Sequence, residues 1–203
     1  MRDVILYATD TMADWEYGYL TAGLTMANEM EPGRFRLRVL AEGQPEVTTA
    51  GRLRLRTDGD IGEVDADQVA LLVLPGADTW FDGQDRVLEL TRSLVERGTP
   101  VAAICGATYG LARAGLLDTR RHTSNALDFL ESSGYAGTEH YVHDRVVDDQ
   151  NVITAPASAP VDFSAAIFRR IGLFPPAITD AWYGLYTTGE RRYYDALVGA
   201  EPA

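Results

Sequence analysis

The segment Gly98–Ala112 reads G-T-P-V-A-A-I-C-G-A-T-Y-G-L-A and contains the only cysteine of the chain, Cys105. An apolar run comes first, a turn follows at the cysteine, and the residues after it favour a helix. This order predicts a buried strand, a sharp turn and a helix with the thiol at the corner, like the nucleophile elbow of hydrolases. Such a corner strains the nucleophile toward positive φ and needs small neighbours, which Gly106, Ala103 and Ala107 supply.

The elbow would place the Cys105 sulfur at a helix N-terminus. Unpaired N–H groups and the helix dipole favour a thiolate there, so the sequence predicts a pKa below the ordinary thiol value. The alternative is a buried structural cysteine that acts as a small apolar side chain.

Composition excludes several kinds of function. The 203 residues carry a net charge of -12, which argues against a nucleic-acid partner, and all 18 basic residues are arginine. Without lysine there is no Schiff-base or Walker A chemistry. A single cysteine forms no internal disulfide and no multi-cysteine zinc site, which favours a cytoplasmic location. The longest apolar run, Val69–Leu74, is too short to span a membrane, so no membrane association is predicted.

Strand-like and helix-like segments alternate along the chain. This alternation predicts an α/β sandwich with a mostly parallel sheet. Strands are predicted at 4–8, 35–40, 69–74, 101–104, 141–147 and 152–155, with a hairpin at 47–56 on a sheet edge; helices are predicted at 15–30, 86–97, 126–132, 161–171 and 177–198, besides the helix of the elbow.

Three blocks resemble the PfpI/DJ-one superfamily of class I glutamine amidotransferase-like proteins. They are the elbow block Ala102–Thr108, the block Ala114–Asp118 and the block His122–Asn125. The resemblance spans roughly residues 3–172 and implies a flavodoxin-like three-layer sandwich that forms a homodimer. We expect residues 1–203 to form a single domain with a C-terminal helical extension from about residue 175.

The resemblance also implies roles for particular residues. Cys105 matches the nucleophile, and Glu16 matches a glutamate that contacts the thiol. Gly76 and Gly106 match positions whose backbone N–H groups form an oxyanion site. The alternative for Glu16 is a solvated carboxylate in the first turn of a helix.

The histidine that serves as general base in the superfamily is missing from its usual places. Those places hold Gly106, Asn125 and the segment Ile153–Ser158, so glutaminase activity is not expected. Asn125, His122 and Thr108 are candidate pocket residues, although His122 should face away from Asn125 if the segment is a regular strand. His140 and His143 are interpreted as surface residues, and neither a metal nor another cofactor is predicted.

Two functions follow, and the sequence does not separate them. The first is a hydrolase or small-carbonyl enzyme in which the Cys105 thiolate attacks a small-molecule electrophile. The second is a redox sensor or protective protein in which an oxidant reversibly modifies Cys105. A third interpretation is an inert scaffold with a vestigial elbow.

Overall fold

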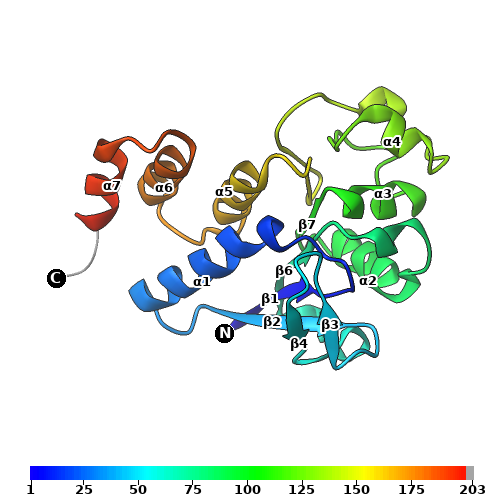
Figure 1. Ribbon diagram of the computed structural model, residues 1–203, viewed down its shortest axis with the longest axis horizontal. Helices are drawn as coiled ribbons and strands as arrows, with labels where there is room; N and C mark the ends of the chain where they lie inside the picture. Colours follow the sequence, from blue (N-terminus) through cyan, green and yellow to red (C-terminus); the bar gives the residue numbers. More distant parts are fainter. Residues whose placement is uncertain (200–203) are drawn as a thin grey trace.

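The computed structural model describes residues 1–199, and Figure 1 shows the order of the elements. The strands are β1 (Arg2–Tyr7), β2 (Phe35–Ala41), β3 (Glu46–Thr48), β4 (Arg54–Arg56), β5 (Gly59–Asp60), β6 (Val69–Leu74), β7 (Val101–Ile104), β8 (Val147–Asp149) and β9 (Val152–Ala155). The α-helices are α1 (Gly18–Met30), α2 (Asp85–Glu96), α3 (Gly106–Arg113), α4 (Leu127–Glu131), α5 (Pro160–Ile171), α6 (Pro176–Thr188) and α7 (Arg191–Val198). Short 3-10 helices include η1 (Asp14–Glu16), η4 (Asp78–Phe81) and η5 (Thr138–His140).

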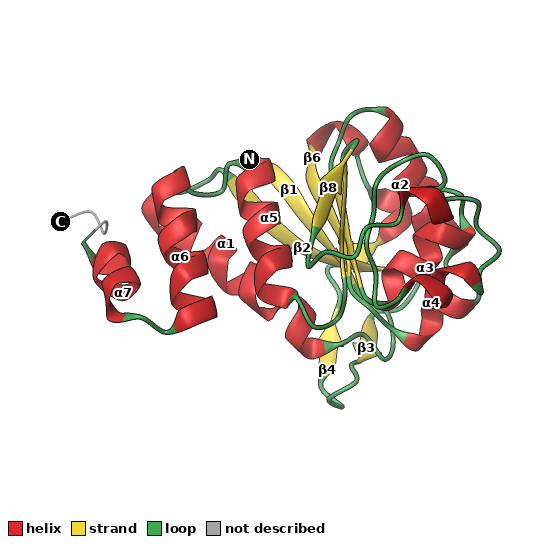
Figure 2. Ribbon diagram, turned by 90° about the horizontal axis from the view of Figure 1, so that it is seen from above, coloured by secondary structure: helices red, strands yellow, loops and turns green. Residues whose placement is uncertain are grey.

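The main sheet has seven strands in the order β5-β2-β1-β6-β7-β9-β8. All neighbouring strands pair in parallel except β8, which is antiparallel to β9. Helices cover both faces, with α1 and α5 on one side and α2, α3 and α4 on the other (Figure 2). The predicted flavodoxin-like three-layer α/β sandwich is therefore confirmed.

Apolar side chains explain why the sheet is central. Every residue of β6 is buried, as expected for a parallel strand covered on both faces. One core lies between the sheet and the helices α1 and α5, where Leu20, Phe163 and Phe168 meet. The second lies under α2 and α3, where Leu94 and Leu111 meet the sheet. The carboxyl ends of β1, β6 and β7 therefore open at one edge of a rigid sheet, which is where open α/β sheets bind ligands.

Three predicted elements differ from the observed ones. The predicted strand at 141–147 is wrong: only β8, from Val147, is a strand, and Tyr141 forms one isolated bridge with His122. The predicted hairpin exists, but β3 and β4 form a separate two-stranded sheet instead of an edge of the main one. The predicted helix at 177–198 is two helices, because Gly189 ends α6 at a φ of 70°.

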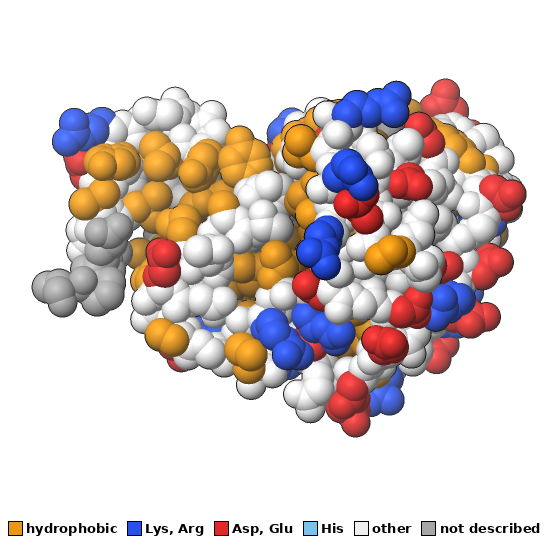
Figure 3. All heavy atoms as spheres, turned by 60° about the horizontal axis from the view of Figure 1, so that its bottom comes forward, with side chains coloured by type: hydrophobic (Ala, Val, Ile, Leu, Met, Phe, Trp, Pro, Cys, Tyr) orange, Lys and Arg blue, Asp and Glu red, His pale blue; other side chains and the backbone are white. Residues whose placement is uncertain are grey.

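The two last helices pack outward from α5. Trp182 of α6 is buried against Phe168, with ring centroids 4.8 Å apart. Figure 3 shows hydrophobic side chains gathered on one part of the surface. Tyr186 of α6 and Tyr194 and Val198 of α7 are exposed large hydrophobic residues. That residues 1–203 form a single domain with a C-terminal extension stays a prediction. Residues 200–203 lie outside the described part of the chain. Within residues 1–199, no helix has both the length and the apolar character needed to cross a membrane.

Candidate active site

Cys105 occupies the predicted elbow. It follows β7 and precedes α3, and its φ of 58° and ψ of -124° lie in a region that residues other than glycine rarely adopt. Its backbone N–H donates to the carbonyl oxygen of Ala155 at 2.9 Å, which ties the turn to β9. The strained turn directs the thiol out of the sheet at the carboxyl edge, as in the nucleophile elbow.

Two glycines make room for this corner. A Cβ atom at Gly76 would lie 2.6 Å from the Cβ atom of Cys105 and 2.9 Å from its Sγ atom. A Cβ atom at Gly106 would lie 2.8 Å from the carbonyl oxygen of Ala77. These distances are too short for real side chains, so both positions require glycine for close approach of the two loops.

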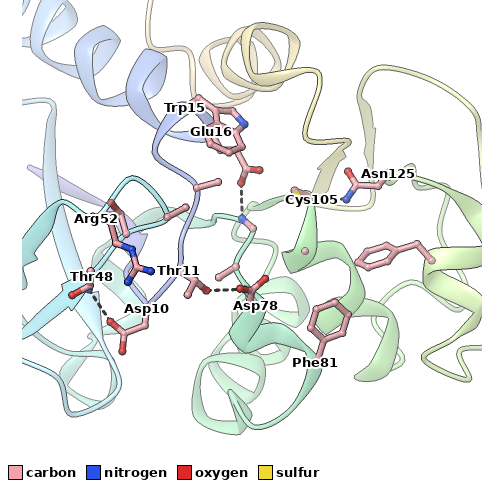
Figure 4. A pocket seen from close by; sticks show the side chains of 17 residues that line it. Asp10, Thr11, Trp15, Glu16, Thr48, Arg52, Asp78, Phe81, Cys105 and Asn125 are labelled. Atoms are coloured by element: carbon pink, nitrogen blue, oxygen red, sulfur yellow. Dashed lines mark hydrogen bonds between the residues drawn. The ribbon is translucent and has the colours of Figure 1, made fainter.

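Glu16 is fully buried beside the elbow, so its interpretation as a solvated carboxylate is wrong. Its Oε2 atom accepts the backbone N–H of Gly76 at 2.6 Å (Figure 4). Its Oε1 atom is buried and accepts no hydrogen bond of ordinary geometry from residues 1–199. Burial raises the pKa of Glu16 to about 7, and hydrogen bonds to Gly76 N–H and to the Cys105 thiol oppose that rise.

The Gly76 bond changes one predicted role. The sequence assigned the Gly76 N–H to an oxyanion site, but Glu16 already accepts that N–H. The N–H of Gly106 forms a hydrogen bond to the Cys105 sulfur that favours the thiolate. Of the two amides predicted to stabilise an oxyanion, that of Gly76 is therefore bound to a carboxylate, whereas that of Gly106 adjoins the nucleophile.

The Cys105 thiol has a raised pKa, which contradicts the prediction of a lowered one. Burial is the largest cause and the charge of Glu16 is the second, and together they raise the pKa of Cys105 to about 11. Hydrogen bonds from Asn125 and from the Gly106 N–H oppose the rise. The sequence argument considered only the helix N-terminus and left out the cost of burying a charge.

Asn125 is oriented toward the sulfur by a second hydrogen bond. Its Oδ1 atom accepts the backbone N–H of Ala157 at 2.8 Å, so its amide NH2 group faces the other way. The Nδ2 atom donates to Cys105 Sγ at 3.4 Å. Asn125 therefore stabilises a thiolate but takes up no proton, unlike the histidine that the superfamily places there.

Thr108 and His122 are buried next to the site and do not line its cavity. Thr108 is buried in α3, donates to the Cys105 carbonyl oxygen at 2.6 Å and lies 2.7 Å from the Ser124 hydroxyl. His122 is also buried, with Nδ1 2.8 Å from the Arg120 carbonyl oxygen and Nε2 3.1 Å from the Tyr135 hydroxyl. Burial lowers the pKa of His122 below its ordinary value, and both ring nitrogens have partners other than the Cys105 sulfur.

Cys105 opens into a cavity of about 690 Å³ (Figure 4). Asn125 lines this cavity with the sulfur, whereas Thr108 and His122 do not. The other lining residues come from the segment after β1, the hairpin, the segment after β6, the start of α3 and α4. They are Asp10, Thr11, Ala13, Trp15, Glu16, Thr48, Thr49, Ala50, Arg52, Gly76, Ala77, Asp78, Phe81, Gly106 and Phe129. Sequence reasoning missed Trp15, Arg52, Phe81 and Phe129, because only the folded chain brings these segments together.

No cluster of three or more potential metal ligands occurs in residues 1–199. His140 lies in η5 next to Glu139, with 3.7 Å between Nε2 and Oε1, and neither His140 nor His143 lines the cavity.

The chain is similar in sequence to known proteins and to a family model. The model of the DJ-1/PfpI family matches residues 2–170. The uncharacterized protease YoaZ of Bacillus subtilis is 36% identical over 202 residues, covering 97% of this chain and 96% of that protein. The protein/nucleic acid deglycase 2 of Escherichia coli is 29% identical over 126 residues, covering 60% of this chain and 72% of that protein.

A solved structure agrees with this match. The thiJ/pfpI family protein from Bacillus anthracis superimposes with a TM-score of 0.92 at 34% identity, covering 98% of this chain and 96% of that one. The chain belongs to the DJ-1/PfpI family.

Proposed function

We propose that this protein is a cysteine-dependent enzyme that acts on small electrophilic carbonyl compounds, as a hydrolase of activated esters or as a small-carbonyl enzyme. The observation that carries the proposal is the pairing of a buried Glu16 with the Cys105 thiol at the mouth of a cavity of about 690 Å³. Perturbed ionisable groups that meet in a cavity are typical of catalytic sites.

Glu16 and Cys105 titrate as a pair. The raised pKa values, about 7 for Glu16 and about 11 for Cys105, mean that the pair holds one proton between those pH values. With the proton on sulfur, the charge lies on Glu16; with the proton on Glu16, the charge lies on the thiolate. Because the pKa of Cys105 is the higher of the two, the first form predominates, and hydrogen bonds from Asn125 and from the Gly106 N–H raise the share of the second. This minor form supplies the nucleophile above about pH 7 without a histidine.

The first chemical step uses these groups in sequence. The thiolate attacks the carbonyl carbon, a bond forms between sulfur and carbon, and the π electrons of the C=O bond move to oxygen. The Gly106 N–H stabilises that oxyanion. With an aldehyde, protonated Glu16 gives the shared proton to the oxyanion and a hemithioacetal forms. With an activated ester, the oxyanion re-forms the C=O bond and expels the alkoxide or phenoxide, and water then cleaves the resulting thioester to the acid and the thiol.

The absence of a histidine from the lining of the cavity limits the leaving group. An amide leaves only when an acid protonates its nitrogen; Asn125 supplies no such proton, and the scheme above assigns the single proton of Glu16 to the oxyanion. We therefore infer that glutamine is not a substrate. The names of the two relatives, a protease and a deglycase, fit carbonyl chemistry at a cysteine, and the Cys105 cavity favours small carbonyl compounds over protein chains.

Turnover by variants tests the proposal. Methylglyoxal consumption, p-nitrophenyl acetate hydrolysis and glutamine hydrolysis are measured with wild type, Cys105→Ser and the control His140→Ala, which changes a residue outside the cavity. We expect the first or second activity in wild type and in the control, and its loss in Cys105→Ser. Cysteine-dependent glutamine hydrolysis would contradict the limit on leaving groups, and no cysteine-dependent turnover would refute the enzyme.

A redox sensor is the second candidate, favoured by the same thiolate and by the absence of a general base. Mild peroxide would then oxidise Cys105 before the exposed methionines Met1, Met26 and Met30. Peptide mapping by mass spectrometry measures that order. Oxidation that returns to the thiol with a reductant, combined with no turnover, favours the sensor over the enzyme.

We also propose a cytoplasmic homodimer. The exposed Tyr186, Tyr194 and Val198 give the C-terminal helices an apolar surface that a second copy would cover. Sedimentation of wild type and Tyr194→Glu checks this: a dimer that becomes a monomer in the variant supports it, and a wild-type monomer refutes it.

A further inference from the structure

One wall of the cavity beside Cys105 is aromatic. Phe81 and Phe129 both line the cavity, and Phe81 is 54% exposed although it is a large apolar residue. Their ring centroids lie 6.1 Å apart with the rings edge to face. Each ring also packs against Tyr109 of α3, with centroid distances of 5.1 Å for Phe81 and 5.4 Å for Phe129. Mutual packing holds these rings in place, so the wall exists before any ligand arrives.

The wall is joined to the catalytic residues by short stretches of chain. Phe81 ends η4, five residues after Gly76, and Phe129 lies in α4, four residues after Asn125. Trp80 anchors η4 because it is fully buried and donates from Nε1 to the Pro75 carbonyl oxygen at 2.7 Å. Phe81 is therefore an exposed ring on a rigid support, in the same cavity as the sulfur (Figure 4).

The remaining walls differ in character. The hairpin and the loop after β1 line the cavity with the polar residues Asp10, Thr11, Thr48 and Arg52, and the exposed ring of Trp15 lies beside Glu16 in the same lining (Figure 4). Both oxygens of Asp10 accept hydrogen bonds, one from Gln44 and one from the Thr48 N–H. An apolar group on a ligand gains by leaving water at the rings of Phe81 and Phe129 or at the exposed ring of Trp15, whereas the hairpin side offers charged and hydroxyl groups. Phe81 and Phe129 pack on each other and on Tyr109, so they offer an apolar wall of two rings that is already in place.

We propose that Phe81 and Phe129 form a specificity subsite for an aromatic substituent, so that the preferred substrates are aryl-bearing aldehydes or activated esters. The aryl ring would pack on the two phenylalanine rings while the carbonyl carbon meets Cys105 Sγ. The inference rests on the proposed function and names the substrate class for it. The covalent step is the thiolate addition described above: an aldehyde takes the shared proton of Glu16 on its new oxyanion, and an activated ester loses its alkoxide or phenoxide before water cleaves the thioester.

Two alkylating probes test the subsite without requiring turnover. Second-order rate constants for modification of Cys105 by iodoacetamide and by N-benzyl iodoacetamide are measured by intact-mass spectrometry. The same two constants for glutathione give the intrinsic ratio of the reagents. We expect the ratio of benzyl to parent reagent to exceed that of glutathione by about tenfold, the gain from partial burial of a phenyl ring.

Variants assign that gain to the wall. Phe81→Ala and Phe129→Ala should each lower the ratio at least threefold, and Phe81→Leu should keep part of it. The control Tyr186→Ala removes another exposed aromatic ring, 48% exposed and outside the cavity, and should leave the ratio unchanged. Circular dichroism confirms that each variant is folded; because Phe81 is more than half exposed, its replacement costs little packing.

Each result decides a separate question. A wild-type ratio equal to that of glutathione, or one that survives both alanine substitutions, overturns the subsite. Slow reaction with both reagents together with a raised ratio supports the subsite and counts against the reactive thiolate. Fast reaction with a glutathione-like ratio does the reverse.

Discussion

The Nδ2 atom of Asn125 lies 3.4 Å from the Sγ atom of Cys105, and its orientation is fixed from the other end by the Ala157 N–H. The side chain next to the sulfur is thus an amide, which does not titrate. A histidine in this place would make the charge of the site change with pH. The hydrogen bond that Asn125 donates opposes the rise in the Cys105 pKa, and Asn125 neither gains nor loses a proton in doing so.

Replacing Asn125 tests that hydrogen bond. Asn125→Ala removes the donor and should slow alkylation of Cys105 by iodoacetamide at pH 8 by up to about tenfold. Asn125→Asp also adds a like charge beside the sulfur and should slow it further. Rates come from quenched mass spectrometry, and equal rates in all three proteins would show that the bond does not act on the thiolate.

Glu16 makes stability depend on pH. Its folded-state pKa, about 7, lies above its ordinary value of 4.5, so between those pH values the folded state keeps a proton that the unfolded state has lost. Stability from this group is therefore full below about pH 4.5 and falls as the pH rises toward 7, by about 3 kcal/mol in all. Glu16→Gln keeps the Gly76 bond and has no such loss.

Urea unfolding of wild type and Glu16→Gln at pH 5 and pH 8 measures this loss. The free energy of unfolding of the variant relative to wild type should increase by about 2 to 3 kcal/mol at the higher pH. The same difference at both pH values would mean that Glu16 is ionised throughout.

Gly76 should not tolerate a side chain. In Gly76→Ala the new Cβ atom meets the Cβ atom of Cys105, whose position is fixed by the turn, so we expect a loss of about 3 kcal/mol in stability and a loss of alkylation. Gly18→Ala is the matched control: nothing lies within 4 Å of its Cβ position at the start of α1, and it should gain up to about 1 kcal/mol. Thermal unfolding that ranks the two variants the other way would contradict the packing of the elbow.

The elbow stores strain at the nucleophile. Glycine normally destabilises an ordered position relative to alanine, but at a φ of 58° the order should reverse. We expect Cys105→Gly to be more stable than Cys105→Ala by about 1 kcal/mol, and both to be inactive. If Cys105→Ala is the more stable in chemical unfolding, the turn is unstrained.

The sequence was sufficient for the architecture because its signals were local. The buried run of β6 and the corner at Cys105 each report on a single segment, and both are confirmed. Strand 141–147 was wrong because alternating residues there lie beside the His122 segment with one isolated bridge and no ladder.

The chemistry of the site depends on long-range contacts that no local pattern reports. The Gly76 N–H is taken by a carboxylate 60 positions earlier, and burial outweighs the helix N-terminus at Cys105. Phe81 of η4 and Phe129 of α4 form the aromatic wall, and the resemblance to the family did not predict that contact. The resemblance to the family could indicate which positions form the site. It could not indicate their hydrogen-bond partners or the direction in which the pKa of Cys105 shifts.

The shared proton of Glu16 and Cys105 is the central claim, and the pH profile of Cys105 alkylation tests it most directly. Rate constants with iodoacetamide are measured from pH 5 to pH 12 for wild type and Glu16→Gln, with folding checked at each end. Wild type should show two rises, one near pH 7 and one near pH 11, and Glu16→Gln should lack the first. A single rise near the free-thiol value of about 8.5, the same in both proteins, would contradict the account.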